Sequence, residues 1–382
     1  MIKARKYCLF LLGSALLIRV VLLPLRVHAD GGAPNLAYVA GASQGVAIID
    51  VAQQKLAARF TVAGDPHTIL LSPTGQLLYV TQPGPGRVSV LAAKTGQTIC
   101  NASFPGHPSL LALSVDGTVL YSAGTNETTI MAIDAQTCAL QHTFRTSEPV
   151  SWIAVAGITT GNALHSQLWI AGTSAVSILD EQGQELASIP VAGGPQFLSL
   201  PGSLTAYVAT RQGAVMAIDM LNRRVFTVLL TGGSFGSMDY DAVSGDIYVP
   251  DQQHNQVDVL SPVLAGSGLA TPEPERVIHL NSSPQSIAIT NDGQLGFVAL
   301  SGGQVDMLDI PGRSIVNTIS VGGQPHFIIT GPYPPPDVPT SQPTATSPPH
   351  LTLLELTAAL LIGAFIGVGW FIWRKWKKRP SF

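Results

Sequence analysis

Short runs of alternating apolar and polar residues fill the middle of the chain, between about residues 33 and 331. An aromatic residue followed by a small or β-branched one recurs there every 38 to 49 residues. These aromatic positions are Tyr38, Tyr79, Tyr121, Trp169, Tyr207, Tyr248 and Phe297. Each is followed by three further strand-like runs separated by Gly- and Pro-rich turns. Since period-two alternation predicts strands, four short strands per repeat of about 42 residues indicate the blades of an all-β propeller.

Three runs carry a family resemblance: Leu78–Thr81 (LYVT), Val88–Leu91 (VSVL) and Val321–His326 (VGGQPH). They are similar to the YVTN-type β-propeller repeat, and the similarity extends over nearly all of residues 33–331 in seven degenerate copies. The units around Tyr121 and Trp169 depart from the pattern. The resemblance implies a seven-bladed propeller in which each innermost strand follows a Pro. Because the chain enters on a second strand and ends on an innermost one, we expect the N- and C-terminal strands to share one blade and close the ring.

Residues 1–29 resemble a secretory signal peptide. Basic residues near the N-terminus precede a long apolar run, and Val27–Ala29 is similar to a cleavage site. Arg19 and Arg26 interrupt the apolar run, so an uncleaved membrane anchor is the alternative. Either interpretation predicts export of the propeller.

The other end of the chain predicts a membrane tether. Residues 332–350 are rich in Pro, Thr and Ser, which favours an extended stalk. Residues 351–373 are apolar and long enough to cross a bilayer, and the tail 374–382 is strongly basic. By the positive-inside rule the tail is cytoplasmic. We therefore expect a single-pass protein of the cell membrane with the propeller outside.

Charge excludes one class of partner. Charged residues make up 11% of the chain, and between residues 30 and 373 there are 23 acidic residues against 10 basic ones. Phosphate binding needs clustered Lys and Arg, so this composition argues against a nucleic-acid-binding protein.

The candidate chemistry is sparse and lies at predicted strand ends. Five of the seven third strands end in Asp, which we interpret as a cap for the following turn. His67 and His326 each follow a Pro at the start of adjacent innermost strands, and His107 lies on the next blade. Three neighbouring imidazoles would suit Zn or Cu. Because metal-binding HxH and CxxC motifs are absent, however, we predict no bound metal. The loops on the same face predict a ligand-binding rim, made of Arg87, Asn126, Arg211, Asp251 and His254.

The sequence therefore predicts a recognition or scaffold module of the cell surface, which binds a protein, a glycan or a small ligand. No catalytic residue and no cofactor is indicated, because nucleophile, phosphate-loop and metalloprotease motifs are missing. The alternatives are a propeller enzyme or enzyme subunit, similar to lactonases or quinone-dependent dehydrogenases, and a structural protein of a surface layer.

Cys100 and Cys138 are the only cysteines after the signal segment. Export would allow a disulfide between them. The repeat alignment places Cys100 on an outer strand and Cys138 at a turn of the next blade. Because blades splay apart at the rim and a disulfide needs close Cα atoms, the alignment favours two free thiols, and the disulfide is the alternative.

Overall fold

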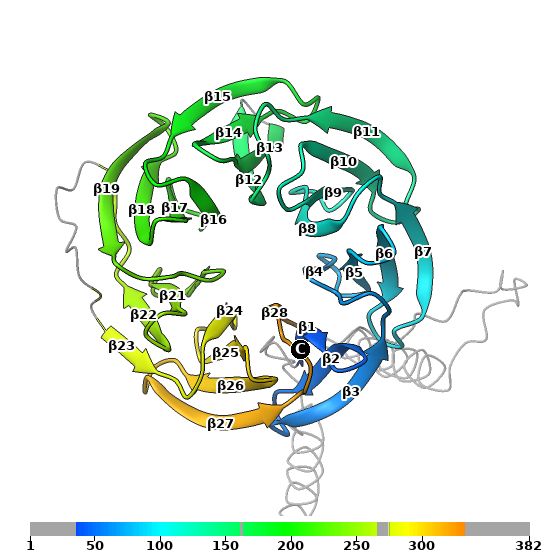
Figure 1. Ribbon diagram of the computed structural model, residues 1–382, viewed down its shortest axis with the longest axis vertical. Coiled ribbons are helices and arrows are strands. Elements are labelled where there is room, and N and C mark those ends of the chain that lie inside the picture. The colour runs from blue at the N-terminus through cyan, green and yellow to red at the C-terminus, as the bar shows by residue number, and fades with distance from the viewer. Residues whose placement is uncertain (1–35, 161–162, 266–273, 275, 333–382) are drawn as a thin grey trace, which may run out of the picture. The chain divides into compact units, whose positions relative to one another are not determined.

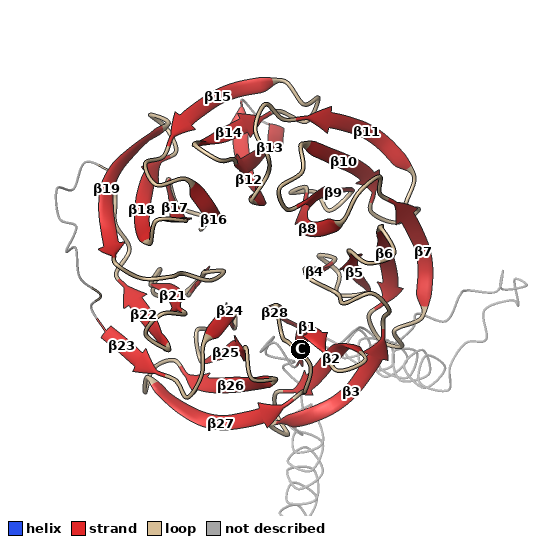
Figure 2. Ribbon diagram, viewed as in Figure 1, coloured by secondary structure: helices blue, strands red, loops and turns tan. Residues whose placement is uncertain are grey.

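The computed structural model describes residues 36–160, 163–265, 274 and 276–332. These residues form 28 strands in seven four-stranded antiparallel sheets arranged around a central axis, and they contain no helix (Figures 1 and 2). In this part of the chain no helix could cross a membrane. The predicted signal peptide, the stalk beyond Pro332, the transmembrane segment and the basic tail lie outside the described residues.

The seven sheets are named blades I to VII in chain order, and each is given from its innermost to its outermost strand. Blade I is β28 (Phe327–Gly331), β1 (Leu36–Ala42), β2 (Gly45–Asp50) and β3 (Lys55–Thr61). Blade II is β4 (Ile69–Leu71), β5 (Leu77–Gln82), β6 (Arg87–Ala92) and β7 (Thr98–Ser103). Blade III is β8 (Pro108–Leu113), β9 (Val119–Gly124), β10 (Thr129–Asp134) and β11 (Leu140–Arg145). Blade IV is β12 (Trp152–Thr160), β13 (Ala163–Ala171), β14 (Ala175–Leu179) and β15 (Glu185–Pro190). Blade V is β16 (Pro195–Ser199), β17 (Thr205–Thr210), β18 (Ala214–Asp219) and β19 (Arg224–Thr231). Blade VI is β20 (Asp239–Tyr240), β21 (Ile247–Asp251), β22 (Gln256–Leu260) and β23 (Arg276–His279). Blade VII is β24 (Pro284–Ile289), β25 (Leu295–Leu300), β26 (Gln304–Asp309) and β27 (Ser314–Ser320).

The hydrophobic core lies between adjacent blades. The aromatic residue of each repeat is almost fully buried in the second strand, as with Tyr38, Trp169 and Phe297, which are 0%, 1% and 0% exposed. Outer strands instead alternate, so β3 buries Phe60 while most of its neighbours face solvent. Each sheet thus buries both faces of its inner strands against the neighbouring blades, which explains the near-continuous apolar runs of the sequence.

The ring closes as the sequence predicts. β28 from the C-terminal side pairs with β1 from the N-terminal side, in a register that joins Ala40 to Phe327 and Leu36 to Gly331. Four of the five strand-ending Asp residues, Asp50, Asp134, Asp180 and Asp219, accept hydrogen bonds from the following turn as predicted. Asp134, for example, accepts hydrogen bonds from the Gln136 and Thr137 backbone N–H groups, at 3.0 and 2.8 Å.

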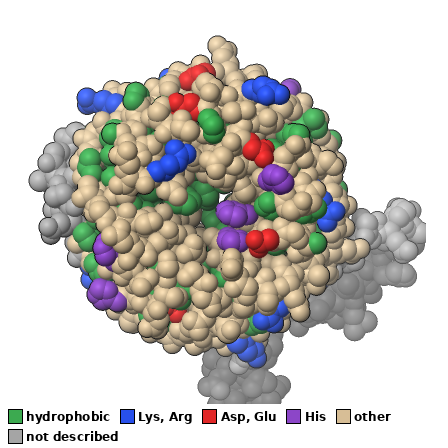
Figure 3. All heavy atoms as spheres, in the orientation of Figure 1, with side chains coloured by type: hydrophobic (Ala, Val, Ile, Leu, Met, Phe, Trp, Pro, Cys, Tyr) green, Lys and Arg blue, Asp and Glu red, His purple; other side chains and the backbone are tan. Residues whose placement is uncertain are grey.

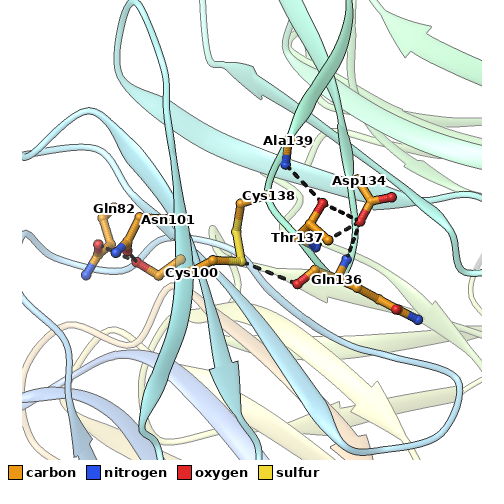
Figure 4. Close-up of a disulfide and its surroundings, with 9 residues drawn as sticks. Gln82, Cys100, Asn101, Asp134, Gln136, Thr137, Cys138 and Ala139 are labelled. Carbon is orange, nitrogen blue, oxygen red and sulfur yellow. Dashed lines mark hydrogen bonds between the residues drawn. A yellow bond between two sulfur atoms is a disulfide. The ribbon is translucent and has the colours of Figure 1, made fainter.

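The prediction of two free thiols is wrong. Cys100 on β7 and Cys138 in the β10–β11 turn form a disulfide, with their Cα atoms 6.0 Å apart (Figure 4). Cys138 has a left-handed backbone, with φ at 61°, as does Gln54 in the equivalent turn of blade I. In this conformation the turn reaches over the outer strand of the preceding blade. The Asn317 amide donates to the Gln54 carbonyl at 2.8 Å at the corresponding position between blades VII and I. At these two places the turn of one blade contacts the outer strand of the preceding blade, so the splaying of the blades does not keep the two cysteines apart.

Candidate functional site: the mouth of the central channel

The innermost strands converge at one face of the ring, where they enclose a cavity of about 850 Å³. Blades I to V supply its lining, and Figure 3 shows this face with several imidazole side chains beside the central opening. The register of β28 on β1 places Phe327 at this end, whereas Leu36 and Gly331 lie at the opposite end of their strands. The mouth therefore opens on the face away from the points where the described chain begins and ends.

Two imidazoles from different blades stack at the mouth. The rings of His67 and His326 lie 4.8 Å apart between centroids and are inclined by 18°. Each follows a Pro in the connection that leads to an innermost strand, so equivalent positions of adjacent repeats meet near the axis. His326 Nε2 lies 3.2 Å from Asp65 Oδ2. Burial, and then the proximity of His326, lowers the pKa of His67, so this imidazole is neutral at pH 7.

His107 lies on the same rim, and its hydrogen bonds differ from those of His67 and His326. Its Nδ1 lies 3.0 Å from the Pro83 carbonyl oxygen and donates to it, because a carbonyl oxygen can only accept. Its backbone N–H donates to Glu127 Oε1 at 2.7 Å. Among the described residues, no three His, Cys, Asp or Glu side chains are grouped to hold a metal ion.

Arg211 joins blade V to blade IV at the mouth. Its guanidinium donates to the Ser151 hydroxyl and, at 3.3 Å each, to the carbonyl oxygens of Gly172 and Thr173. These two carbonyls belong to the turn between β13 and β14. The turn is consequently held in place by a guanidinium that still has N–H groups to offer, because Arg carries five donors.

Glu148 holds the same turn from its N–H side. Its carboxylate accepts from the backbone N–H groups of Thr173 and Ser174, at 2.7 and 2.9 Å, and from the Ser174 hydroxyl. These hydrogen bonds, led by those from Ser174, lower the pKa of Glu148 to about 2. The carboxylate is therefore ionised at all physiological pH values.

Two aromatic residues, Trp152 and Phe197, line the cavity and belong to a larger aromatic cluster. The Trp152 ring lies 5.1 Å from that of Phe197, edge to face, and 5.8 Å from that of Phe327. Trp152 also lines a second, deeper cavity in the channel. The mouth thus combines polar groups at its edge with an apolar surface below them.

Five of the eight residues that the sequence singled out line this cavity. They are His67, His107, Asn126, Arg211 and His326. Arg87 does not line it and instead donates to the Gln82 side chain. Asp251 and His254 are also outside it, on blade VI, where His254 Nδ1 lies 2.6 Å from Asp251 Oδ2. This contact raises the pKa of His254.

Sequence reasoning missed Ser151, Trp152 and Phe197 as lining residues. The repeat alignment could have identified them. Gln196 of blade V occupies the position equivalent to His67, and both residues line the cavity. Ser151 and Phe197 directly follow Val150 and Gln196, the equivalents of His67 in blades IV and V.

No family model matches this chain, and neither does any curated protein. Among solved structures, hydrazine synthase of Kuenenia stuttgartiensis aligns with a TM-score of 0.59 and 17% identity, over 70% of this chain and 90% of that one. The dihydro-heme d1 dehydrogenase NirN, solved in complex with DHE, aligns with a TM-score of 0.58 and 16% identity, over 79% and 76%. The β-propeller domain of Cps50 (Swd1) from Myceliophteria thermophila aligns with a TM-score of 0.59 and 16% identity, over 71% and 91%. Likeness at this level of identity shows the fold alone, and the fold is that of a seven-bladed β-propeller.

Proposed function

We propose that this chain is a membrane-tethered recognition module of the cell surface, and that its mouth cavity binds a small ligand bearing a carboxylate. The observation that carries the proposal is the lining of the cavity. Hydrogen-bonding side chains from five blades surround a volume of about 850 Å³, which is in the usual range for small-molecule sites.

The lining is rich in donors. It contains one guanidinium, three imidazoles and two side-chain amides, from Arg211, His67, His107, His326, Asn126 and Gln196. Asp65 is the one carboxylate in the lining, and it already contacts His326. The guanidinium is a permanent cation that forms strong, charge-assisted hydrogen bonds with carboxylates, so this set favours an oxygen-rich anion over a cation. The rings of Trp152 and Phe197 favour a ligand with an apolar or ring-shaped part.

The predicted membrane topology suits this role. The stalk and the transmembrane segment predicted from the sequence follow Pro332, at the end of β28 that lies away from the mouth. Export would place the propeller, and with it the mouth cavity, outside the cell. The similarity to YVTN-type repeats covers the propeller and is consistent with such an extracytoplasmic module.

The second candidate is a propeller enzyme or a subunit of one. Two proteins with the same fold, hydrazine synthase and NirN, are named as enzymes. Their identity to this chain is 17% and 16%, so the support is limited to the fold. An enzyme would convert the ligand of the mouth cavity, whereas a recognition module would return it unchanged, so recovery of the ligand after incubation with the protein separates the two candidates.

The test compares two probes that share a ring and differ in charge, phenylacetate and 2-phenylethanol. Binding to the purified full-length protein is measured by calorimetry at pH 7. We expect phenylacetate to bind about tenfold or more tightly than the alcohol, because only the acid pairs with the guanidinium. Arg211→Gln should remove this preference. Arg87→Gln, which makes the same change outside the cavity, should keep it.

Because Arg211 also holds a turn of blade IV, His67→Gln serves as a second variant within the cavity. It should weaken phenylacetate binding without touching that turn. Equal affinity for the two probes in the unaltered protein would overturn the proposal. So would a loss of the preference in Arg87→Gln that matches the loss in Arg211→Gln.

A further inference from the structure

A second cavity of about 360 Å³ lies deeper in the channel than the mouth, and Trp152 lines both. We name it the lower chamber. The innermost strands β4, β8, β12, β16, β20 and β28 form its walls. Most of its lining residues are of apolar type, among them Leu71, Leu113, Val155, Leu200 and Phe327.

Asp239 of blade VI is the one carboxyl group in the lining of the lower chamber, and no Lys, Arg or His lines it among the described residues. The side chain is held in place by blade VII, since Asp239 Oδ2 accepts from the Ile289 backbone N–H at 2.7 Å. One carboxyl oxygen is therefore used by the scaffold.

The backbone around Asp239 departs from the repeat. β20 has only two residues, and the segment before it leaves its own blade. Ser237 instead forms a parallel bridge with Ser286 of blade VII. Its N–H donates to the Gln285 carbonyl at 3.1 Å. This shift places Asp239 against the inner edge of β24, where the other blades have no carboxyl group.

The electrostatic surroundings of Asp239 are unfavourable for a negative charge. The pKa of Asp239 is raised to about 6, first by burial and also by nearby Asp241, while hydrogen bonds from the Ile289 and Tyr240 backbones act in the opposite direction. The other titratable group in the lining is Tyr240, which is neutral at pH 7 because burial, and then Asp239, raises its pKa. A carboxylate in an apolar chamber lacks a compensating positive charge.

We propose that the lower chamber binds an organic cation with an apolar body, an alkyl- or arylammonium ion, with Asp239 as its counter-ion. An anion would be repelled by the carboxylate, and a neutral apolar ligand would leave the negative charge uncompensated. A bare metal ion would find too few oxygen ligands, because the remaining polar side chains of the lining are Ser199, Ser237 and Tyr240. Trp152, Tyr240 and Phe327 supply the aromatic rings that attract organic ammonium ions.

The proposal is independent of the carboxylate site at the mouth. The probe is phenethylammonium, compared with neutral 2-phenylethanol, and both are titrated into the full-length protein by calorimetry. At pH 8 we expect the ammonium ion to bind about tenfold or more tightly than the alcohol. Its affinity should fall about tenfold per pH unit below pH 6, as Asp239 becomes protonated. Titrations at pH 5.5 in two buffers of different ionisation enthalpy should show a proton released on binding.

Asp239→Asn is the decisive variant, because the Asn Oδ1 can still accept from the Ile289 N–H while the charge is lost. It should remove both the preference for the ammonium ion and its pH dependence. Asp292→Asn, the same change in the β24–β25 turn outside both cavities, should alter neither. If Asp239→Asn fails to fold, the pH profile and proton release of the unaltered protein still decide the question.

Three results would overturn the proposal: no preference for the ammonium ion at pH 8, an affinity that is constant between pH 5 and 8, or an unchanged preference in Asp239→Asn. Arg211→Gln separates the two sites, because it should weaken phenylacetate and leave phenethylammonium unaffected.

Discussion

Three acidic residues at turns of blades I to V differ in their surroundings from three acidic residues within strands of blades VI and VII. In the first group Asp134, Glu148 and Asp219 accept several hydrogen bonds at turns, and these bonds lower their pKa. In the second group Asp258 and Asp306 lie within strands, and burial raises their pKa, as it does for Asp239. The first arrangement follows the repeat and supports it. The second departs from the repeat and costs stability, and such departures are where function is expected.

The two cavities of the channel also differ in the blades that line them. The lining of the mouth comes from blades I to V, whose innermost strands begin in the regular way. Blade VI contributes instead to the lower chamber, through the irregular segment that carries Asp239. Regular blades therefore position many donors around one opening, while the irregular blade places a single carboxyl group in the channel.

The largest effect should come from opening the ring at blade I. Deleting residues 323–331 removes β28, which leaves the apolar residues of β1 without an inner neighbour. We expect aggregation or loss of cooperative thermal unfolding, because the buried faces of blades I and II become exposed. Truncation after Pro332 retains β28 and is the control. A soluble deletion variant with an unchanged melting temperature would contradict the shared blade.

The rim disulfide should have the next largest effect. It links two blades across a sequence separation of 38 residues. Closing a loop of this length stabilises the folded state by about 4 kcal/mol in the chain-entropy model. Cys138→Ser and Cys100→Ser should each lower the free energy of unfolding by a similar amount, measured by denaturant titration, and the double variant should add little. Full alkylation of both cysteines in the unreduced, unfolded protein would contradict the bond.

Asp306 tests the cost of the carboxyl groups in blade VII. It is 0% exposed, its Oδ1 accepts from the Thr318 hydroxyl at 2.6 Å, and its Oδ2 has no hydrogen-bond partner. Ser89 and Ser177 occupy the equivalent position in blades II and IV. Asp306→Ser should therefore raise the free energy of unfolding at pH 8 by about 1–3 kcal/mol.

The pH dependence of this effect has a definite sign. Burial raises the pKa of Asp306 above 3.8, so the folded protein holds a proton that the unfolded chain releases. The resulting stabilisation is complete below pH 3.8 and is lost as pH rises through the raised pKa. The advantage of Asp306→Ser should consequently grow over that interval and then level off. A gain that is the same at pH 4 and pH 8 would show that the carboxyl group is not buried as described.

The smallest effect is expected at Glu148, on the regular side of the ring. Its pKa of about 2 lies below the ordinary value of 4.5, so its contribution is present above pH 4.5 and is lost as pH falls toward 2. Glu148→Gln should speed hydrogen exchange of the Thr173 and Ser174 amides several-fold at pH 7 and leave distant blades unchanged. Unchanged exchange at these two amides would refute their capping by the carboxylate.

The fold was predictable because its signals are local and repeated. Alternating strands, Gly and Pro turns and the aromatic positions each point to the same blade, and counting strands from both ends predicts the closure by β28. The stacking of His67 and His326 also follows from their equivalent positions in adjacent repeats. These inferences need only the order of strands within a blade.

Other features depend on how blades meet in space. The disulfide needs a left-handed turn at Cys138 that reaches the preceding blade, which strand spacing does not reveal. Arg87 and His254 lie in loops that are equivalent to those of Asn126 and Arg211. Their side chains nevertheless contact residues of their own blade and do not line the mouth cavity. Asp239 escaped notice because its strand is too short and irregular to resemble the repeat.

The most direct test of the account is a crossed titration of two probes against two variants of the full-length protein at pH 8. Phenylacetate and phenethylammonium share a ring and carry opposite charges, and Arg211→Gln and Asp239→Asn each remove one charge from one cavity. We predict that Arg211→Gln weakens only phenylacetate and that Asp239→Asn weakens only phenethylammonium, each by about tenfold or more. Loss of both probes in either variant, or of neither probe in both, would contradict a channel with two sites of opposite charge.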